Sequence, residues 1–574
     1  MKTKRRVAYG VGSFKELRQK NSYFVDKTRY IELLENYENP VFLRPRRFGK
    51  SLWCSILSHY YDINQKEQFK ALFGDTYVGQ HPTPLKNSFM ILHLDFSVID
   101  VSTDLKEIEI SFRGHCNRTL ETLLCTYAKY FHGAPEINFE HTASYNLGVV
   151  FNHIQQSDAP PLYLIIDEYD SFANQLVVRY QEQVYQDLTS DASFFKTFFR
   201  TIKSGRQMGS IANSFITGVL PITMDDLTSA YNIAYFLTLR PPFASMLGYT
   251  QEEVETWLRS IYEEYELNPE SFNEVKGMIK NHYNGYCFVE ENEPLYNSTL
   301  VNYFLKSLTE KKRAPRILVD ENLRIDITWI ERLTARNPQK TEALIDQLAI
   351  EGWIHYEYRF LSQKFNMHQF FEESYFPISF FYLGMLTLED QYRMKVPNPN
   401  IREIMGDYFT QVHHIDASNR YEEMMRSFDM QGDMEKLFAD YWKLYISQFP
   451  EAIFQKVNEN FYRSTFFELC SRFLSHLYSW NVERSYPSGK SDLEFVGKYH
   501  EKFAGLRWVI EFKYYSNAEF RKLNRSIEAF ELQPEDTEQI AGYVEGLRRE
   551  YPEAQISQFV VYCFGNQGFR VFAL

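Results

Sequence analysis

The chain has 574 residues, of which 44% are hydrophobic, 17% aromatic and 24% charged. This length exceeds what one hydrophobic core normally supports, so we expect several domains, and the aromatic content argues against long disordered segments. The formal net charge of −13 excludes a generally basic surface that would coat nucleic acid, although it is compatible with a local basic groove.

Cysteines and apolar runs give no sign of export or membrane insertion. The six cysteines are scattered and form no Cys-x-x-Cys pair, so we expect reduced thiols and neither structural zinc nor a disulfide framework. No run of about 18 apolar residues occurs, and no apolar stretch follows the basic N-terminus. We therefore expect a cytoplasmic protein without a membrane partner.

Residues 1–240 alternate short apolar runs with helical patterns, which is typical of an α/β domain with a parallel sheet. The sequence predicts strands at 41–43, 90–96, 162–167 and 215–219. Most of these are near-continuous apolar runs, as expected for strands that are buried on both faces.

The first predicted strand leads through a loop into a helix that begins near Lys50. Such a loop directs backbone N–H groups and the positive end of the helix dipole at an anion. The sequence predicts an ATP-binding P-loop here, formed by Arg46, Arg47, Phe48, Gly49, Lys50 and Ser51. Lys50 would reach the β- and γ-phosphates, and Ser51 would ligate Mg²⁺. Arg44 replaces the first glycine of the usual pattern, and Gly-Lys-Ser alone is also compatible with a chance sequence.

A second motif supports the phosphate site. The apolar strand 162–167 ends in Asp167 and is followed by Glu168, as a Walker B strand requires. Asp167 would hold Mg²⁺ through water, and Glu168 would activate the attacking water as a catalytic residue. Thr217, at the end of the next strand, could sense the γ-phosphate or could be an ordinary strand end.

The rest of the chain changes character twice. Residues 241–450 show long helical patterns, as in 252–265 and 421–448, and Pro241-Pro242 marks their start. Residues 451–574 return to mixed α and β structure. There the sequence predicts helices at 457–477 and 538–549, and strands at 492–496, 508–515, 558–564 and 569–573.

Charged residues interrupt the predicted strand 508–515. Glu511 and Lys513 share one face of it, and Asp492 begins the preceding strand. An Asp followed by Glu-x-Lys is typical of metal-dependent phosphodiesterases: Asp492 and Glu511 would bind Mg²⁺, and Lys513 would position water or stabilise developing charge. Glu459 could add a carboxylate. The alternative is an internal Glu–Lys ion pair on an edge strand.

Nearly the whole chain resembles bacterial AAA-ATPase-like proteins that carry a C-terminal PD-(D/E)XK nuclease domain. The similar segments are 23–28, 44–51, 166–170, 284–286 and 295–297, together with Glu459, Asp492, Glu511, Lys513, Gln539 and Tyr543. The lost glycine at Arg44 is a feature of that family's P-loop, whereas Ser491 replaces the proline that often precedes the nuclease Asp.

The resemblance implies three domains: an AAA-like P-loop ATPase (1–240), a helical, lid- or winged-helix-like region (241–450) and a restriction-endonuclease-like α/β domain (451–574). It implies ATP and Mg²⁺ as cofactors, nucleic acid, expected to be DNA, as partner, and hydrolase activity at both sites. It does not determine whether the protein forms an oligomer. The main alternative is a nucleotide-gated switch whose C-terminal fold only binds nucleic acid or protein, and a third is that both sites have decayed.

Overall fold

A computed structural model describes residues 4–133, 135–179, 181–227, 230–290, 292–315, 318, 332, 338–362, 364–416, 420–475, 477–498 and 502–574. The chain forms two compact units. The first comprises 1–265, 286–310 and 355–394, and the second comprises 266–285, 311–354 and 395–574. Among the helices in the described part of the chain, none has the length and apolar character needed to cross a membrane.

The first unit is built on a five-stranded sheet with the order β2-β3-β4-β1-β5. Its strands are β1 (Pro40–Leu43), β2 (Met90–Asp95), β3 (Leu162–Asp167), β4 (Ile211–Gly218) and β5 (Tyr235–Phe236). All the neighbouring strands pair in parallel, so the carboxyl ends of β1, β3 and β4 lie at one edge. This confirms the predicted parallel α/β fold, with β1 followed by the P-loop segment.

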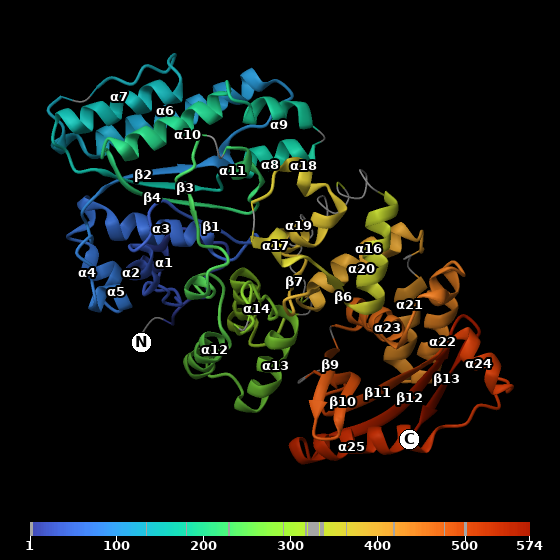
Figure 1. The fold of residues 1–574 in the computed structure, drawn as a ribbon. Coiled ribbons are helices and arrows are strands. Elements are labelled where there is room, and N and C mark those ends of the chain that lie inside the picture. Colours follow the sequence, from blue (N-terminus) through green and yellow to red (C-terminus); the bar gives the residue numbers. More distant parts are fainter. Residues whose placement is uncertain are drawn as a thin grey trace. The chain divides into compact units, whose positions relative to one another are not determined.

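Helices cover both faces of this sheet, with α3 and α1 on one side and α6, α7 and α10 on the other (Figure 1). Every residue of β3 is consequently buried, which explains its unbroken apolar run. The helices that begin in this unit are α1 (Phe14–Gln19), α2 (Tyr30–Leu34), α3 (Lys50–Tyr61), α4 (Phe69–Phe73), α5 (Tyr77–Gln80), α6 (Leu105–Thr126), α7 (Ala143–Gln156), α8 (Ser171–Val178), α9 (Glu182–Thr189), α10 (Phe194–Gln207), α11 (Ile222–Asp226), α12 (Gln251–Tyr265), α14 (Ser298–Lys311), α17 (Tyr358–Ser362), α18 (Met367–Phe370) and α19 (Phe376–Leu383).

Two features of the first sheet escaped the sequence pattern. Strand β4 begins at Ile211, four residues before the apolar run, because its polar residues are satisfied inside the fold. Asn213 Oδ1 accepts from the Asn39 N–H at 2.8 Å, and Ser214 Oγ lies 3.0 Å from the Tyr231 hydroxyl. Strand β5 has only two residues, too few for a recognisable alternation.

The second unit contains a mixed sheet with the order β13-β12-β11-β10-β9. Its strands are β9 (Tyr478–Tyr486), β10 (Gly489–Gly497), β11 (Leu506–Tyr515), β12 (Gln555–Phe564) and β13 (Gly568–Ala573). Strands β11 and β12 are parallel and are joined through α24 (Asn517–Leu523) and α25 (Pro534–Glu550), whereas the other pairs are antiparallel. Among the residues of this unit that the structure describes, the other α-helices that begin here are α13 (Phe272–Tyr283), α16 (Pro338–Glu351), α20 (Pro399–Val412), α21 (Arg420–Gln431), α22 (Met434–Leu444) and α23 (Glu459–Leu474).

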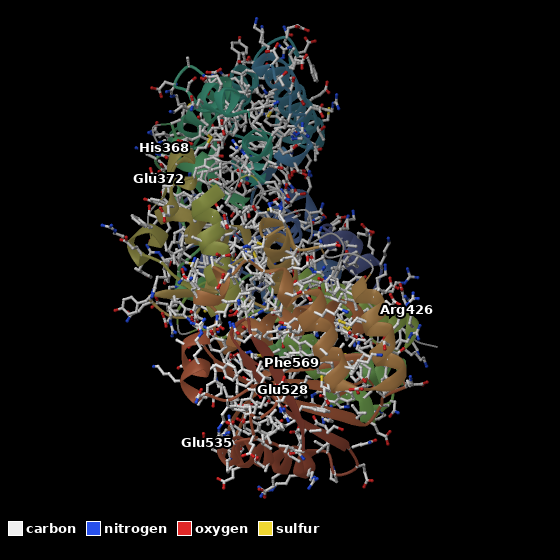
Figure 2. All side chains as sticks on the ribbon, turned by 90° about the vertical axis from the view of Figure 1, so that its right-hand side faces the viewer. His368, Glu372, Arg426, Glu528, Glu535 and Phe569 are labelled. Atoms are coloured by element: carbon white, nitrogen blue, oxygen red, sulfur yellow. The ribbon has the colours of Figure 1, made fainter. Side chains whose placement is uncertain are left out.

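The mixed sheet lies between two helical layers, with α25 on one face and α22 and α23 on the other (Figure 1). On the α25 side, Ile540 and Leu547 of the helix belong to one buried cluster with Val509 and Val560 of the strands. On the other side, the Phe438 ring of α22 lies 5.1 Å from Phe569 of β13, which Figure 2 labels. These layers confirm the predicted C-terminal α/β fold.

The middle of the chain contributes to both units. The chain passes from the second unit to the first within the short strand β6 (Trp353–His355), and it returns to the second unit within β8 (Arg393–Lys395). Strand β7 (Thr387–Leu388) comes shortly before β8. The predicted helical character of this region is confirmed by its many helices. Its division at 240 and 450 stays a proposal.

Candidate functional site

The loop between β1 and α3 has the backbone shape of an anion cradle. Gly49 precedes α3 with φ of 91°, a left-handed conformation that glycine adopts without strain, and Arg47 adopts φ of 71°. The buried ammonium of Lys50 donates to the carbonyl oxygens of Arg44 and Pro45, each at 3.0 Å. Burial lowers the pKa of Lys50, while the nearby Glu168 and Asp167 favour its charge. The lysine is thus folded over the loop that would hold the phosphates.

Arg44, in the place of the missing glycine, is a structural residue. Its guanidinium is buried and donates to the carbonyls of Leu43 (3.1 Å), Thr238 (2.9 Å) and Ala244 (3.0 Å). It also lies over the Phe288 ring at 4.1 Å, and burial lowers its pKa to about 9. The side chain therefore anchors the start of the loop in the interior, which explains how the loop forms without its first glycine.

The N-terminus of α14 braces the loop. Asn297 Nδ2 donates to the Arg46 carbonyl at 3.3 Å, while Ser298 Oγ and Thr299 Oγ1 donate to the Arg47 carbonyl at 3.1 and 2.9 Å. Because the C=O and N–H of a trans peptide point in opposite directions, the next amide after each carbonyl faces away from α14. Of these three residues, only Asn297 lies in a segment that the family resemblance singled out, 295–297. Its partner Arg46 is 251 residues away in the sequence, so no local pattern predicts the contact.

An apolar pocket adjoins the loop. It encloses about 580 Å³ of empty space, part of it open to solvent, and its walls include Tyr23, Phe24, Phe48, Trp53, Met246 and Tyr249 beside Gly49. The Phe48 ring is buried and contacts Tyr286 edge-to-face at 5.0 Å. The aromatic walls suit stacking with a flat heterocyclic base, whose phosphates would enter the loop.

The acids predicted after β3 lie at the same edge of the sheet as the loop. Burial raises the pKa of Asp167 to about 6, against the opposing effect of the nearby Ser51 hydroxyl. Glu168 is half-buried with φ of 50°, a strained conformation for a residue with a side chain, of the kind found at functional sites. The structure thus brings Lys50, Ser51, Asp167 and Glu168 together, while Arg46 is exposed and close enough to act on the charge of Lys50.

Thr217 has a different environment from the one expected of a phosphate sensor. Its fully buried hydroxyl donates to the Phe42 carbonyl at 2.7 Å, across the pair of β4 and β1. The contact gives the hydroxyl a structural role in the sheet. The sensor role stays a prediction.

The acids of the second unit converge from two strands and a helix. The register that pairs Leu493 with Ile510 sets Asp492 of β10 opposite Glu511 of β11, and cross-strand neighbours share a face. Asp492 Oδ2 also accepts from the Phe512 N–H at 2.7 Å. Glu459 begins α23 and lies near enough for its carboxyl to interact with both Asp492 and Lys513.

Lys513 is held at this point by three partners. Its ammonium lies 3.0 Å from Glu511 Oε1, 3.0 Å from Gln539 Oε1 and 3.5 Å from Asp536 Oδ1. Gln539 Nε2 in turn donates to Glu511 Oε1 at 2.7 Å and to the Tyr543 hydroxyl at 2.6 Å. Gln539 and Tyr543, which the family resemblance singled out, thus join the site. Asp536 was not foreseen, although it lies one helical turn before Gln539.

Arg463 is a second unforeseen member. Its guanidinium lies 3.1 Å from Asp492 Oδ1 and 2.7 Å from Glu483 Oε1. The sequence signal that could have found it is the helical spacing of four residues from Glu459, which places both side chains on one face of α23.

Burial and mutual repulsion raise the pKa values of the acids. The pKa of Glu511 rises to about 8, first through burial and then through Asp492, and that of Glu459 rises to about 7 for the same two reasons. Burial also raises the pKa of Asp492, against the opposing effect of Arg463. Glu511 carboxylate oxygen Oε2 is buried and has no hydrogen-bond partner in the described part of the chain. A set of hard oxygen ligands with excess negative charge fits Mg²⁺.

Two family models match segments of the chain that contain the two sites. Residues 8–228 match a family described as predicted AAA-ATPase, and residues 457–573 match the PD-(D/E)XK nuclease superfamily. Among solved structures, a Walker-type ATPase of Pyrococcus abyssi aligns with 66% of this chain and 94% of its own, at 10% identity and a TM-score of 0.39. No curated protein matches the chain.

Proposed function

We propose that this chain, which joins a predicted AAA-ATPase segment to a PD-(D/E)XK nuclease superfamily segment, couples ATP hydrolysis to Mg²⁺-dependent cleavage of nucleic acid. The observation that carries the proposal is the convergence of Asp492, Glu511 and Lys513, with Gln539 bonded to the last two. A cytoplasmic location and DNA as the substrate belong to the same proposal, which leaves the oligomeric state open.

In the first unit, the chain's own groups account for phosphate binding. Lys50 would leave the Arg44 and Pro45 carbonyls for the β- and γ-phosphates, which Arg46, Arg47 and the loop amides would surround. Ser51 and Asp167 would hold Mg²⁺, which supplies charge neutralisation to the phosphates. Glu168 would orient the attacking water and accept its proton.

In the second unit, Asp492, Glu511 and Glu459 would hold Mg²⁺, which supplies Lewis acidity toward a phosphodiester. Lys513 would hold the attacking water and stabilise negative charge that develops on the phosphate. Gln539 bonds to both Glu511 and Lys513, so it would hold the two side chains in fixed positions relative to each other.

One contact favours the alternative of a nucleotide-gated switch. Arg463 already supplies Asp492 with a cationic partner at 3.1 Å, so the acids are partly neutralised by the protein itself. In this alternative the C-terminal fold binds nucleic acid or protein without cleaving it.

An assay of the whole chain described here with radiolabelled DNA and RNA, with Mg²⁺ or Mn²⁺ and with or without ATP, separates the two functions. We expect metal-dependent cleavage that Lys513→Ala reduces at least 100-fold, roughly the contribution of one charge-stabilising group. Lys522→Ala, which removes an exposed lysine of α24, should cleave normally. Cleavage that survives Lys513→Ala would sink the nuclease proposal, and no cleavage under any metal would favour the switch.

ATP turnover is tested with the same protein. Lys50→Ala should lose ATP binding, while Glu168→Gln should bind ATP but turn it over slowly, because only the group that accepts the proton is removed. Equal ATP binding by the wild type and Lys50→Ala would indicate a decayed site.

A further inference from the structure

A second set of ligand atoms lies beside Asp167. The thiol of Cys54 on α3, the imidazole of His93 on β2 and the carboxylate of Asp167 on β3 each place one ligand atom within 4.8 Å of the other two. Strands β2 and β3 are paired, and α3 packs on the same sheet, so the three side chains meet from three different elements. This combination of sulfur, nitrogen and oxygen differs from the all-oxygen set expected around Mg²⁺.

Two of these groups are poised to accept a ligand. His93 Nδ1 lies 3.4 Å from Ser58 Oγ, and Nε2 is buried without a hydrogen-bond partner among the described residues. Asp167 Oδ1 is likewise buried and has no hydrogen-bond partner among the described residues. A buried polar atom that lacks a partner destabilises the fold, because it has lost its hydrogen bonds to water without replacing them. Two such atoms beside a fully buried thiol are therefore unusual for a simple core.

We propose that Cys54, His93 and Asp167 bind a transition-metal ion such as Zn²⁺ in the nucleotide-free protein. A thiolate and an imidazole select Zn²⁺ or a related ion over Mg²⁺ or Ca²⁺, and three protein ligands leave a fourth position for water. Tetrahedral Zn²⁺ sets its ligand atoms about 3.3–3.8 Å apart, so side-chain shifts of roughly 1 Å would close the site. The Cys54 thiol releases its proton to solvent when the metal–sulfur bond forms.

The site has a regulatory consequence because it shares Asp167 with the proposed Mg²⁺–ATP site. A carboxylate that binds Zn²⁺ together with Cys54 and His93 is no longer available to the Mg²⁺ that Ser51 and Asp167 would share. Transition metal and Mg²⁺–ATP therefore weaken each other's binding by the same factor, as thermodynamic linkage requires. This inference goes beyond the proposed function, since metal binding by the nucleotide-free chain does not depend on ATP turnover.

Co²⁺ is the probe for the first test, because thiolate ligation gives it an ultraviolet charge-transfer band. The full chain is treated with a chelator, freed of nucleotide and titrated with Co²⁺. We expect a charge-transfer band that saturates at one Co²⁺ per chain and that Zn²⁺ abolishes. Cys54→Ser and His93→Gln should lose the band or weaken Co²⁺ binding at least tenfold. Cys116→Ser, which alters an equally buried cysteine on α6, should keep it.

The wild-type spectrum alone can overturn the proposal. The test therefore remains decisive even if a variant fails to fold. Absence of the band at millimolar Co²⁺, or its persistence in folded Cys54→Ser, would show that the three groups hold no metal. Thermal unfolding of each variant checks folding.

Competition with nucleotide is the second test. Saturating Mg²⁺–ATP should raise the free Co²⁺ concentration at half-saturation, corrected for Co²⁺ bound to ATP in solution, at least tenfold in the wild type, and it should have no such effect in Lys50→Ala. A Co²⁺ titration that Mg²⁺–ATP leaves unchanged in a protein shown to bind ATP would overturn the linkage. If ATP does not bind but Co²⁺ still gives the band, the ATPase proposal fails and the metal site stands.

Discussion

Lys513 Nζ lies 3.0 Å from Glu511 Oε1, and the two side chains project from the same face of β11. The carboxylate that is expected to bind metal is therefore also the principal partner of the lysine. Burial opposes the charge of Lys513, but Glu511, Asp536 and Glu459 together outweigh this effect and raise the pKa of the lysine to about 12. The lysine stays charged throughout the physiological range, so pH acts on this site through its acids.

Metal binding by the second unit should strengthen as pH rises. Glu459 and Glu511, with pKa values of about 7 and about 8, carry protons at pH 6 that a divalent cation must displace. Below pH 7 the affinity for Mn²⁺ should change by up to about tenfold per pH unit for each proton released, and it should level off above pH 8.5. Calorimetry in buffers of different ionisation enthalpy measures both affinity and proton release. An affinity that is constant from pH 6 to 9 would contradict the raised pKa values.

Glu511→Gln should stabilise the metal-free protein at high pH. The folded-state pKa of Glu511 is raised above its unfolded value, so its proton stabilises the fold below about pH 4.5, and that stability is lost as pH rises to about 8. Glutamine removes the buried charge, and the free energy of unfolding of the second unit at pH 8.5 should increase by on the order of 1 kcal/mol. Urea unfolding at pH 8.5 and pH 5 tests this. Equal stability of variant and wild type at both values would refute the expectation.

Arg44→Gly should damage the P-loop although it restores the usual glycine. The substitution removes the donors that serve the Thr238 and Ala244 carbonyls and leaves a void beside Phe288. We expect a loss of about 2–4 kcal/mol in unfolding free energy and weaker ATP binding. Arg46→Gly, at an exposed position two residues away, should cost no more than about 1 kcal/mol. Equal effects of the two variants would mean that Arg44 does not anchor the loop.

Thr299→Val tests the brace that α14 provides. The substitution keeps the side-chain shape but removes the hydroxyl that donates to the Arg47 carbonyl at 2.9 Å. We expect the dissociation constant for ATP to rise about three- to tenfold, equivalent to a hydrogen bond of about 1 kcal/mol. Thr309→Val, on the same helix but with its hydroxyl bonded to the Lys306 carbonyl, is the matched control. If both variants bind ATP like the wild type, the brace does not position the loop.

Several parts of the fold and site were predictable because their signals are local. The strand that ends at Asp167 is apolar throughout, and Glu511 and Lys513 have the two-residue spacing of one strand face. By contrast, strand β9 escaped prediction because it lies at the sheet edge, and polar residues such as Asn481 and Arg484 interrupt its pattern.

The sequence by itself determined the strand–loop–helix around Lys50, the acids after β3 and the pairing of Glu511 with Lys513, because each depends on residues within a few positions of one another. Only the tertiary structure decided that Arg44 is anchored by a carbonyl 194 residues away and that Cys54, His93 and Asp167 meet. Those contacts follow from strand order and from the packing of α3 on the sheet, and such long-range packing leaves no periodic signal in the chain.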